Sequence, residues 1–245
     1  CKCRSKMEAA TEEKAGNLRG TRWARPLGLP PVLDVAHRQL CMRLPDAAPL
    51  PAPAALPPPF RLARFGEAGT DAETWARVCA EAGLFAREED PEAVLLGRFQ
   101  RDFAAWMAEL PRRMFFVLDE EGSAVGTATA WFSTGKPSHG KEEEEVDWAS
   151  RQGRIHWVSI APRAQGRGLA KLLLVHVLTC LRSLHPGGDI FLTTPTTSAR
   201  AIAMYLELGF VPEPLSPLPD GGYPDDEREG WRLLAECYRL DRLLS

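Results

Sequence analysis

A short glycine-rich turn is the part of this sequence whose residue types and spacing most directly suggest chemistry. It reads Gln165-Gly166-Arg167-Gly168-Leu169-Ala170 and leads into an apolar segment typical of a helix. Glycines let a backbone approach a ligand closely, and the first amides of a helix lack helical acceptors and carry the positive end of its dipole. Arg167 and Lys171 add positive charge beside them. The turn therefore predicts an anion-binding site.

Two familiar phosphate-binding motifs are excluded. The sequence has no GxxxxGK followed by Ser or Thr, so the P-loop pattern is absent. It has no GxGxxG after a first strand with an acidic residue about 20 positions later, so the common dinucleotide pattern is absent too. The turn by itself leaves two alternatives open: a site for another phosphate ligand, or a turn that only allows tight packing of a strand on a helix.

Hydrophobic periodicity predicts the elements that must position this turn. Those around and after it alternate between strand and helix: strand 154–160, helix 169–184, strand 190–193, helix 198–208 and a strand from residue 210. Gly209 suits the left-handed end of the second helix. A final helix is predicted near residues 231–240, where apolar residues recur at helical spacing.

The same patterns predict a regular arrangement before the turn. The elements expected there are strand 60–65, helix 70–83, helix 91–110 and a hairpin of strands 114–118 and 124–132. Thr70 and Glu73 form a capping-box pattern at the start of the first helix, and Pro111 is expected to stop the second. The whole predicts an α/β domain in which strands and helices mix.

The N-terminal quarter of the chain has a different composition. Residues 1–24 are polar, and residues 25–59 are rich in Pro, Ala and Leu, with prolines concentrated from residue 50 onward. Proline lacks the backbone donor that sheets and helices need, so we expect a linker here, although residues 32–44 are apolar enough to dock on a surface. We predict a flexible, partly Pro/Ala-rich extension over 1–59 and one folded domain over 60–245.

Bulk composition excludes several classes of partner. A formal net charge of -3 gives no general attraction to nucleic acid or anionic membranes, and no apolar run approaches the about 18 residues of a membrane helix. The six cysteines lack the CxxC spacing of zinc and redox motifs, so we expect no metal and reduced thiols. A cytoplasmic protein is the expectation, with organellar import left open and the oligomeric state unassigned.

The turn and its surroundings resemble the GNAT superfamily of N-acetyltransferases. The family's pyrophosphate signature is Gln or Arg, two residues, Gly, one residue, then Gly or Ala, and Gln165, Gly168 and Ala170 fill those positions. About 30 residues later the family has a Tyr followed by Gly-Phe, and Tyr205 with Gly209-Phe210 matches that spacing. The resemblance covers roughly residues 60–212. It implies a mixed, mostly antiparallel central sheet flanked by helices, with acetyl-CoA as cosubstrate.

The resemblance also implies which residues bind acetyl-CoA. The strand before the turn would lend main-chain groups of Val158, Ser159 and Ile160 to the pantetheine arm. The turn and the helix start would hold the pyrophosphate through a continuous run: Gln165, Gly166, Arg167, Gly168, Leu169, Ala170 and Lys171. Ser198 stands where the family commonly has Asn, whose side chain would contact the pantetheine amide. The side chain of Ser198 is shorter than that of Asn, but it can still cap a helix.

Two residues are implied for catalysis. In the family a Tyr at the position of Tyr205 donates to the CoA sulfur. Some relatives, such as arylalkylamine N-acetyltransferases, carry a His near the amine where His156 lies here, and a near-neutral pKa suits proton relay. Each has a structural alternative, an aromatic packed on the sheet for Tyr205 and a hydrogen-bonded strand residue for His156. The acidic stretch 141–147 either attracts a cationic amine or is only solvated.

The expected function is transfer of an acetyl group from acetyl-CoA to a primary amine by direct attack in a ternary complex. One alternative is a CoA-binding or acyl-sensing module without activity, and another is an interaction domain that uses the Pro-rich arm. The C-terminus departs from the family, in which a seventh strand often follows Gly-Phe. Several prolines and a predicted helix occupy that region here, so either that strand is displaced or the helix prediction is wrong.

Overall fold

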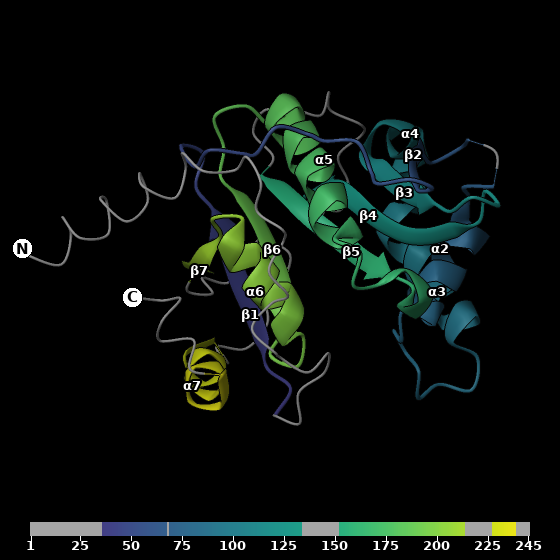
Figure 1. Cartoon of the computed structure of the whole chain (residues 1–245). Helices are drawn as coiled ribbons and strands as arrows, with labels where there is room; N and C mark the ends of the chain where they lie inside the picture. Colours follow the sequence, from purple (N-terminus) through teal and green to yellow (C-terminus); the bar gives the residue numbers. More distant parts are fainter. Residues whose placement is uncertain (1–35, 68, 134–151, 214–226, 239–245) are drawn as a thin grey trace, which may run out of the picture.

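A twisted central sheet organises the computed structural model, which describes residues 36–67, 69–133, 152–213 and 227–238 (Figure 1). Within these residues the sheet has seven strands in the order β2-β3-β4-β5-β6-β1-β7. The strands are β1 (Gln39–Leu44), β2 (Arg61–Arg64), β3 (Met114–Leu118), β4 (Ala124–Phe132), β5 (Gly153–Ile160), β6 (Ile190–Pro195) and β7 (Val211–Glu213). Only β5 and β6 run parallel, whereas all other neighbouring strands are antiparallel. The prediction of a mixed, mostly antiparallel sheet is confirmed.

Helices cover both faces of this sheet. They are α2 (Ala72–Glu81), α3 (Pro91–Phe103), α4 (Leu110–Arg113), α5 (Leu169–Leu184), α6 (Ala199–Glu207) and α7 (Glu227–Tyr238), with 3-10 turns η1 (Ala104–Glu109) and η3 (Pro162–Ala164). In Figure 1, α5 and α6 lie in front of the sheet, while α2 and α3 lie behind it at the right. Leu173, Val177 and Leu181 of α5 are fully buried in the core of the front face. Trp75 of α2 and Phe99 of α3 are fully buried in a second core on the other face.

Strand β1 corrects the predicted domain boundary. It pairs antiparallel with β6 from Gln39 opposite Pro195 to Leu44 opposite Ile190, and its other edge pairs with β7. Its apolar side chains are nearly all buried in the front core. The prediction that the folded domain begins at Phe60 is therefore wrong for these six residues, because burial of an apolar strand between two partners outweighs the proline-rich sequence that follows it. Residues 1–35 lie outside the described part.

The C-terminal region holds both a displaced strand and a helix: the short β7 follows Gly209-Phe210, as predicted, but it pairs with β1 and not with β6. The predicted final helix is present as α7, which contacts β1. A Cβ atom on Gly230 would lie 2.6 Å from Leu40 Cδ2, so glycine is what lets this helix approach the strand. Leu234 is fully buried against the front core. The place in the sheet between β6 and β7 is filled from the N-terminal side, by β1.

Two predicted helix details differ. The N-cap of α2 is Asp71, whose carboxylate accepts from Thr74 N at 2.8 Å, while Thr70 is buried and its hydroxyl donates to Arg64 O at 2.6 Å. The helix predicted over 91–110 ends at Phe103 and continues as η1 and the short α4. Pro111 lies in the first turn of α4, where no helical donor is needed, rather than stopping a helix. No described helix is both long and apolar enough to span a membrane.

Replacing Met42 with Ala tests whether β1 is part of the folded core. Met42 is fully buried, so we expect the free energy of unfolding to fall by about 2 to 5 kcal/mol. Met107→Ala is the matched control, because that side chain is 43% exposed and its truncation should cost less than about 0.5 kcal/mol. Urea denaturation measures both, and equal losses would contradict the role assigned to β1.

Candidate active site

An opening in the sheet lies between β5 and β6. The two strands pair only at Gly153 with Ile190 and at Arg154 with Phe191, and beyond that point they separate. The side chain of Arg154 extends from β5 to β6, where its guanidinium donates to Thr193 Oγ1 at 3.3 Å. The β6-facing backbone of Val158, Ser159 and Ile160 is thus not engaged in the β5–β6 ladder. Backbone donors and acceptors require partners, so this edge suits the amide-containing arm of a ligand.

Strand β5 bulges within this opening. Thr127 of β4 lies opposite Ser159 and Thr129 opposite His156, so Trp157 and Val158 together face the single residue Ala128. Trp157 has a φ of 50°, in the left-handed region that bulky residues rarely adopt. A bulge redirects nearby backbone groups, and such strain persists only where the surroundings hold it. The strand predicted to bind the pantetheine arm therefore has irregular geometry next to the residues expected to contact that arm.

The glycine-rich turn follows directly after β5. Gly166 and Gly168 both have φ near 76°, and a Cβ on either would meet nothing within 4 Å, so their backbones face open space. Gln165 Nε2 donates to Ile160 O at 2.9 Å, which ties the turn to the end of the strand. The first helical bond of α5 runs from Leu172 N to Gly168 O, and no side chain caps the helix. Leu169 and Ala170 precede that bond, so their amides have no helical acceptor and suit an anion.

Positive charges lie around the turn. Lys171 Nζ forms an ion pair with Glu207 Oε2 at 2.8 Å, which joins α5 to α6. The guanidinium of Arg167 lies over the ring of Phe60, with 5.3 Å to its centroid. Both belong to the predicted pyrophosphate site, and their roles there stay a prediction. The geometry of the turn itself, with two left-handed glycines before an uncapped helix, fits a pyrophosphate.

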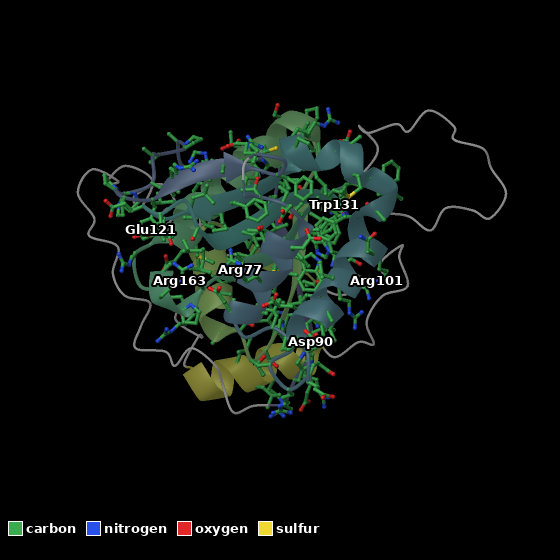
Figure 2. All side chains as sticks on the ribbon, turned by 90° about the vertical axis from the view of Figure 1, so that its right-hand side faces the viewer. Arg77, Asp90, Arg101, Glu121, Trp131 and Arg163 are labelled. Carbon is green, nitrogen blue, oxygen red and sulfur yellow. The ribbon has the colours of Figure 1, made fainter. Side chains whose placement is uncertain are left out.

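A pocket of about 240 Å³ lies beside the turn, and its lining includes Phe60, Arg167 and Arg163. Arg163 is engaged by Asp119 at 2.6 Å and by Glu81 at 3.7 Å. Figure 2 shows Arg163 and Glu121 on the same side of the molecule, away from Trp131 and Arg101. The pocket includes neither predicted catalytic residue, so we place the chemistry at the opening of the sheet and not here.

The two predicted catalytic residues lie on opposite faces of the sheet. Tyr205 of α6 packs in the front core, 5% exposed, with its ring centroid 5.8 Å from that of Phe210. His156 contacts the other core, where its ring centroid lies 5.9 Å from that of Phe103. Burial raises the pKa of Tyr205, so its hydroxyl stays protonated at neutral pH. Ser198 is the N-cap residue of α6, but its side chain makes no cap hydrogen bond.

His156 has an acidic partner that the sequence analysis missed. Its Nε2 lies 3.2 Å from Asp102 Oδ2, and Trp157 Nε1 donates to the same oxygen at 2.9 Å. The other oxygen accepts from Arg101 Nε at 2.7 Å. Asp102 lies near the end of α3, three residues after Phe99 and next to Phe103. A carboxylate on the apolar side of an amphipathic helix is the signal that could have found it.

Burial and hydrogen bonding set the charge states of this pair. Burial of Asp102 opposes its ionisation, but hydrogen bonds from His156, Arg101 and Trp157 outweigh that effect and hold its pKa well below the usual range. Burial lowers the pKa of His156 to about 4, although the carboxylate of Asp102 acts in the opposite direction. At neutral pH the site therefore holds an ionised Asp102 and a neutral imidazole.

His156 should make the fold sensitive to acid. The unfolded chain takes up a proton at this imidazole near pH 6.5, whereas the folded chain does so only near pH 4. We expect this residue alone to lower the free energy of unfolding by about 3 kcal/mol as the pH falls through that interval. His156→Gln should remove that part of the pH dependence. Denaturation at a series of pH values measures it, and identical slopes for both proteins would contradict the low pKa.

The comparisons with known proteins agree with this geometry. The sequence model of the acetyltransferase (GNAT) family matches residues 75–210, more than half of the chain. Mycothiol acetyltransferase of Acidothermus cellulolyticus is 30% identical over 198 residues, 73% of this chain and 53% of that protein. The Nocardia farcinica enzyme of the same name is 33% identical over 119 residues, 47% of this chain and 36% of that protein. The chain thus spans about half the length, or less, of these curated relatives.

A solved structure supports the fold alone. The GCN5-related N-acetyltransferase from Sphaerobacter thermophilus aligns with a TM-score of 0.51 and 21% identity, over 75% of this chain and 50% of that one. Because the family model covers the strand, the turn and both helices that form the opening, the chain belongs to the GNAT acetyltransferase family, whose members use acetyl-CoA as cosubstrate.

Proposed function

We propose that this chain transfers an acetyl group from acetyl-CoA to a primary amine, by direct attack in a ternary complex. One observation carries the proposal: β5 bulges and leaves β6 at the point where two left-handed glycines begin an uncapped helix. A strand edge outside the β5–β6 ladder, followed along the chain by an anion site, matches a ligand with an amide-containing arm and a pyrophosphate.

The pantetheine arm would enter the opening beside β5. The main chain of Val158, Ser159 and Ile160 would then complete its hydrogen bonds with that arm, as a neighbouring strand would. The pyrophosphate would bind the amides from Gly166 to Lys171, while Gln165 holds the turn on the strand end through its bond to Ile160 O. Ser198, at the start of α6 and without a cap bond, remains able to contact the arm from the other side.

Acetyl transfer requires the amine nitrogen to attack the thioester carbon and the carbon–sulfur bond to break. His156 would accept the proton that the attacking nitrogen loses, since its ring is neutral at working pH. The hydroxyl of Tyr205 would donate a proton to the departing sulfur. Proton transfer through solvent from His156 to Tyr205 restores both groups, so the products are an amide and a free thiol. Backbone amides at the bulge, of Val158 or Ser159, would polarise the thioester carbonyl.

The acceptor is proposed as a small amine. The names of the curated relatives make mycothiol-related amines the first acceptors to test. The acidic stretch 141–147, which was considered as an attractant for a cationic amine, lies outside the described residues. A cytoplasmic location fits the proposal, because acetyl-CoA is an intracellular metabolite and Cys79 and Cys180 are free thiols.

Gly168→Ala tests the pyrophosphate site. Alanine at a φ of 76° is strained, so the turn must change shape and withdraw amides from the anion. We expect the Kd for acetyl-CoA to rise about tenfold or more, equal to about 1.4 kcal/mol. Gly187→Ala is the matched control, because Gly187 has a φ of 74°, equally open surroundings and a position after α5, far from the turn. Calorimetry measures both, and equal affinities for the two variants would contradict the assignment.

Tyr205→Phe tests the acid in a turnover screen that follows thiol release across amine classes. Loss of the buried hydroxyl should lower kcat about 100-fold, the usual scale for a positioned acid, because thiolate then departs unprotonated. The Kd for acetyl-CoA should stay within about twofold, since the phenyl ring keeps the packing on Phe210. An unchanged kcat would remove Tyr205 from the mechanism. Binding of acetyl-CoA without turnover of any amine would replace the proposed enzyme with a CoA-binding module.

A further inference from the structure

Asp102 joins two features of the site that come from consecutive residues of β5. One carboxylate oxygen, Oδ2, is within hydrogen-bond distance of both His156 Nε2 and Trp157 Nε1. His156 is the base of the proposed mechanism, and Trp157 is the strained residue of the bulge. The side chains of His156 and Asp102 are only 15% and 14% exposed, so little water competes for these bonds.

The carboxylate of Asp102 decides the tautomer of His156. An ionised carboxylate oxygen can only accept, so Nε2 must carry the proton that it shares with Asp102. Nδ1 is then the unprotonated nitrogen of the neutral ring and can receive a proton. A His156 protonated at Nδ1 would place two lone pairs against each other at 3.2 Å. The contact therefore selects the form of the ring in which one defined nitrogen is the base.

The charge of Asp102 is opposite in sign to that of the other charged groups near His156. Among the described residues, the charged groups that act on His156 are Asp102 and Arg101 from α3 and Arg154 from β5. The two guanidinium groups disfavour an imidazolium, and Asp102 alone favours it. The titratable group of α2 near this face, Cys79, has its pKa raised to about 12 by burial and stays neutral. Stabilisation of the charge that forms during catalysis thus depends on one carboxylate.

We propose that Asp102 is a positioning residue, which fixes the proton of His156 on Nε2 and holds that base at a set distance from the bulge through Trp157. This proposal rests on the proposed function, in which His156 accepts the amine proton. When the proton arrives at Nδ1, the imidazolium retains its bond to the carboxylate, and no proton passes to Asp102. Trp157 keeps the backbone amides of the bulge aligned with the same carboxylate. One side chain of α3 thereby couples the base to the acyl-binding strand.

A double-mutant cycle separates this role from a merely structural one. Asp102→Asn removes the charge with little change of shape, and it is measured in the native background and in His156→Gln. Asp90→Asn is the matched control: Asp90 is the exposed N-cap of the same helix, Asn caps equally well, and Figure 2 shows Asp90 apart from Arg101. Thermal unfolding of each variant verifies that the protein is folded at the assay temperature.

We expect Asp102→Asn to lower kcat about 10- to 100-fold in the native background, with the KM for acetyl-CoA within about threefold. In the His156→Gln background the same change should lower kcat by less than about twofold. Asp90→Asn should leave kcat unchanged. An equal loss of kcat in both backgrounds would overturn the proposal, because Asp102 would then act without His156.

A spectroscopic test holds even if no amine is turned over. The ring nitrogens of His156 are observed by nitrogen-15 NMR of the full chain at neutral pH, with the signal assigned by its absence in His156→Gln. We expect a proton on Nε2 and none on Nδ1, and loss of the Nε2 proton signal to solvent exchange in Asp102→Ala. A proton on Nδ1, or a mixture of both forms in the native protein, would overturn the proposal. Inactivity together with the expected spectrum would count against the proposed function alone.

Discussion

The separation of β5 from β6 is the constraint on which the rest of this structure depends. Strands β5 and β6 pair at only two positions, too few to fix the register of β6. The register of β6 is set instead by β1, with which it forms six residue pairs. Strand β1 in turn carries β7 and α7. Helix α5 contacts β3, β4 and β5 across the front face. The sheet is therefore two supported halves with an opening between them, and the opening leaves backbone for a ligand to pair with.

The proposed chemistry spans that opening. Tyr205 would act from α6, where it packs in the front core, and His156 would act from β5, on the face that α3 covers. Aromatic packing fixes the position of α3, since Phe99 and Phe103 both contact Trp75, whose ring also meets that of Trp157. Asp102 adjoins Phe103 on this helix and accepts a hydrogen bond from Trp157 of the bulge. A hydrophobic core thus positions an ionised Asp102 beside a neutral His156, and through this contact a residue of the core helix would act on the proposed base.

The elements with strong periodicity and clear turns were predictable from the sequence. Strands β3 and β4 and helix α5 have the predicted bounds, because each is apolar on the face it buries and ends at a turn residue. Strand β1 was missed because its partner β6 lies far along the chain and a proline-rich stretch follows it. Asp102 was missed because it meets His156 across 54 residues, in a contact that only the packing of α3 on the sheet creates. The glycine-rich turn, in contrast, indicated an anion site from sequence alone, because its glycines, positive residues and helix start are consecutive in the chain.

A structure of the full chain with bound CoA tests the central claim most directly, namely that acetyl-CoA occupies the opening with its sulfur at Tyr205. The account predicts the pyrophosphate on the amides that follow Gln165, the pantetheine arm paired with Val158 to Ile160, and the sulfur within hydrogen-bond distance of the Tyr205 hydroxyl. CoA bound elsewhere, or a sulfur out of reach of that hydroxyl while β5 and β6 remain open, would contradict it.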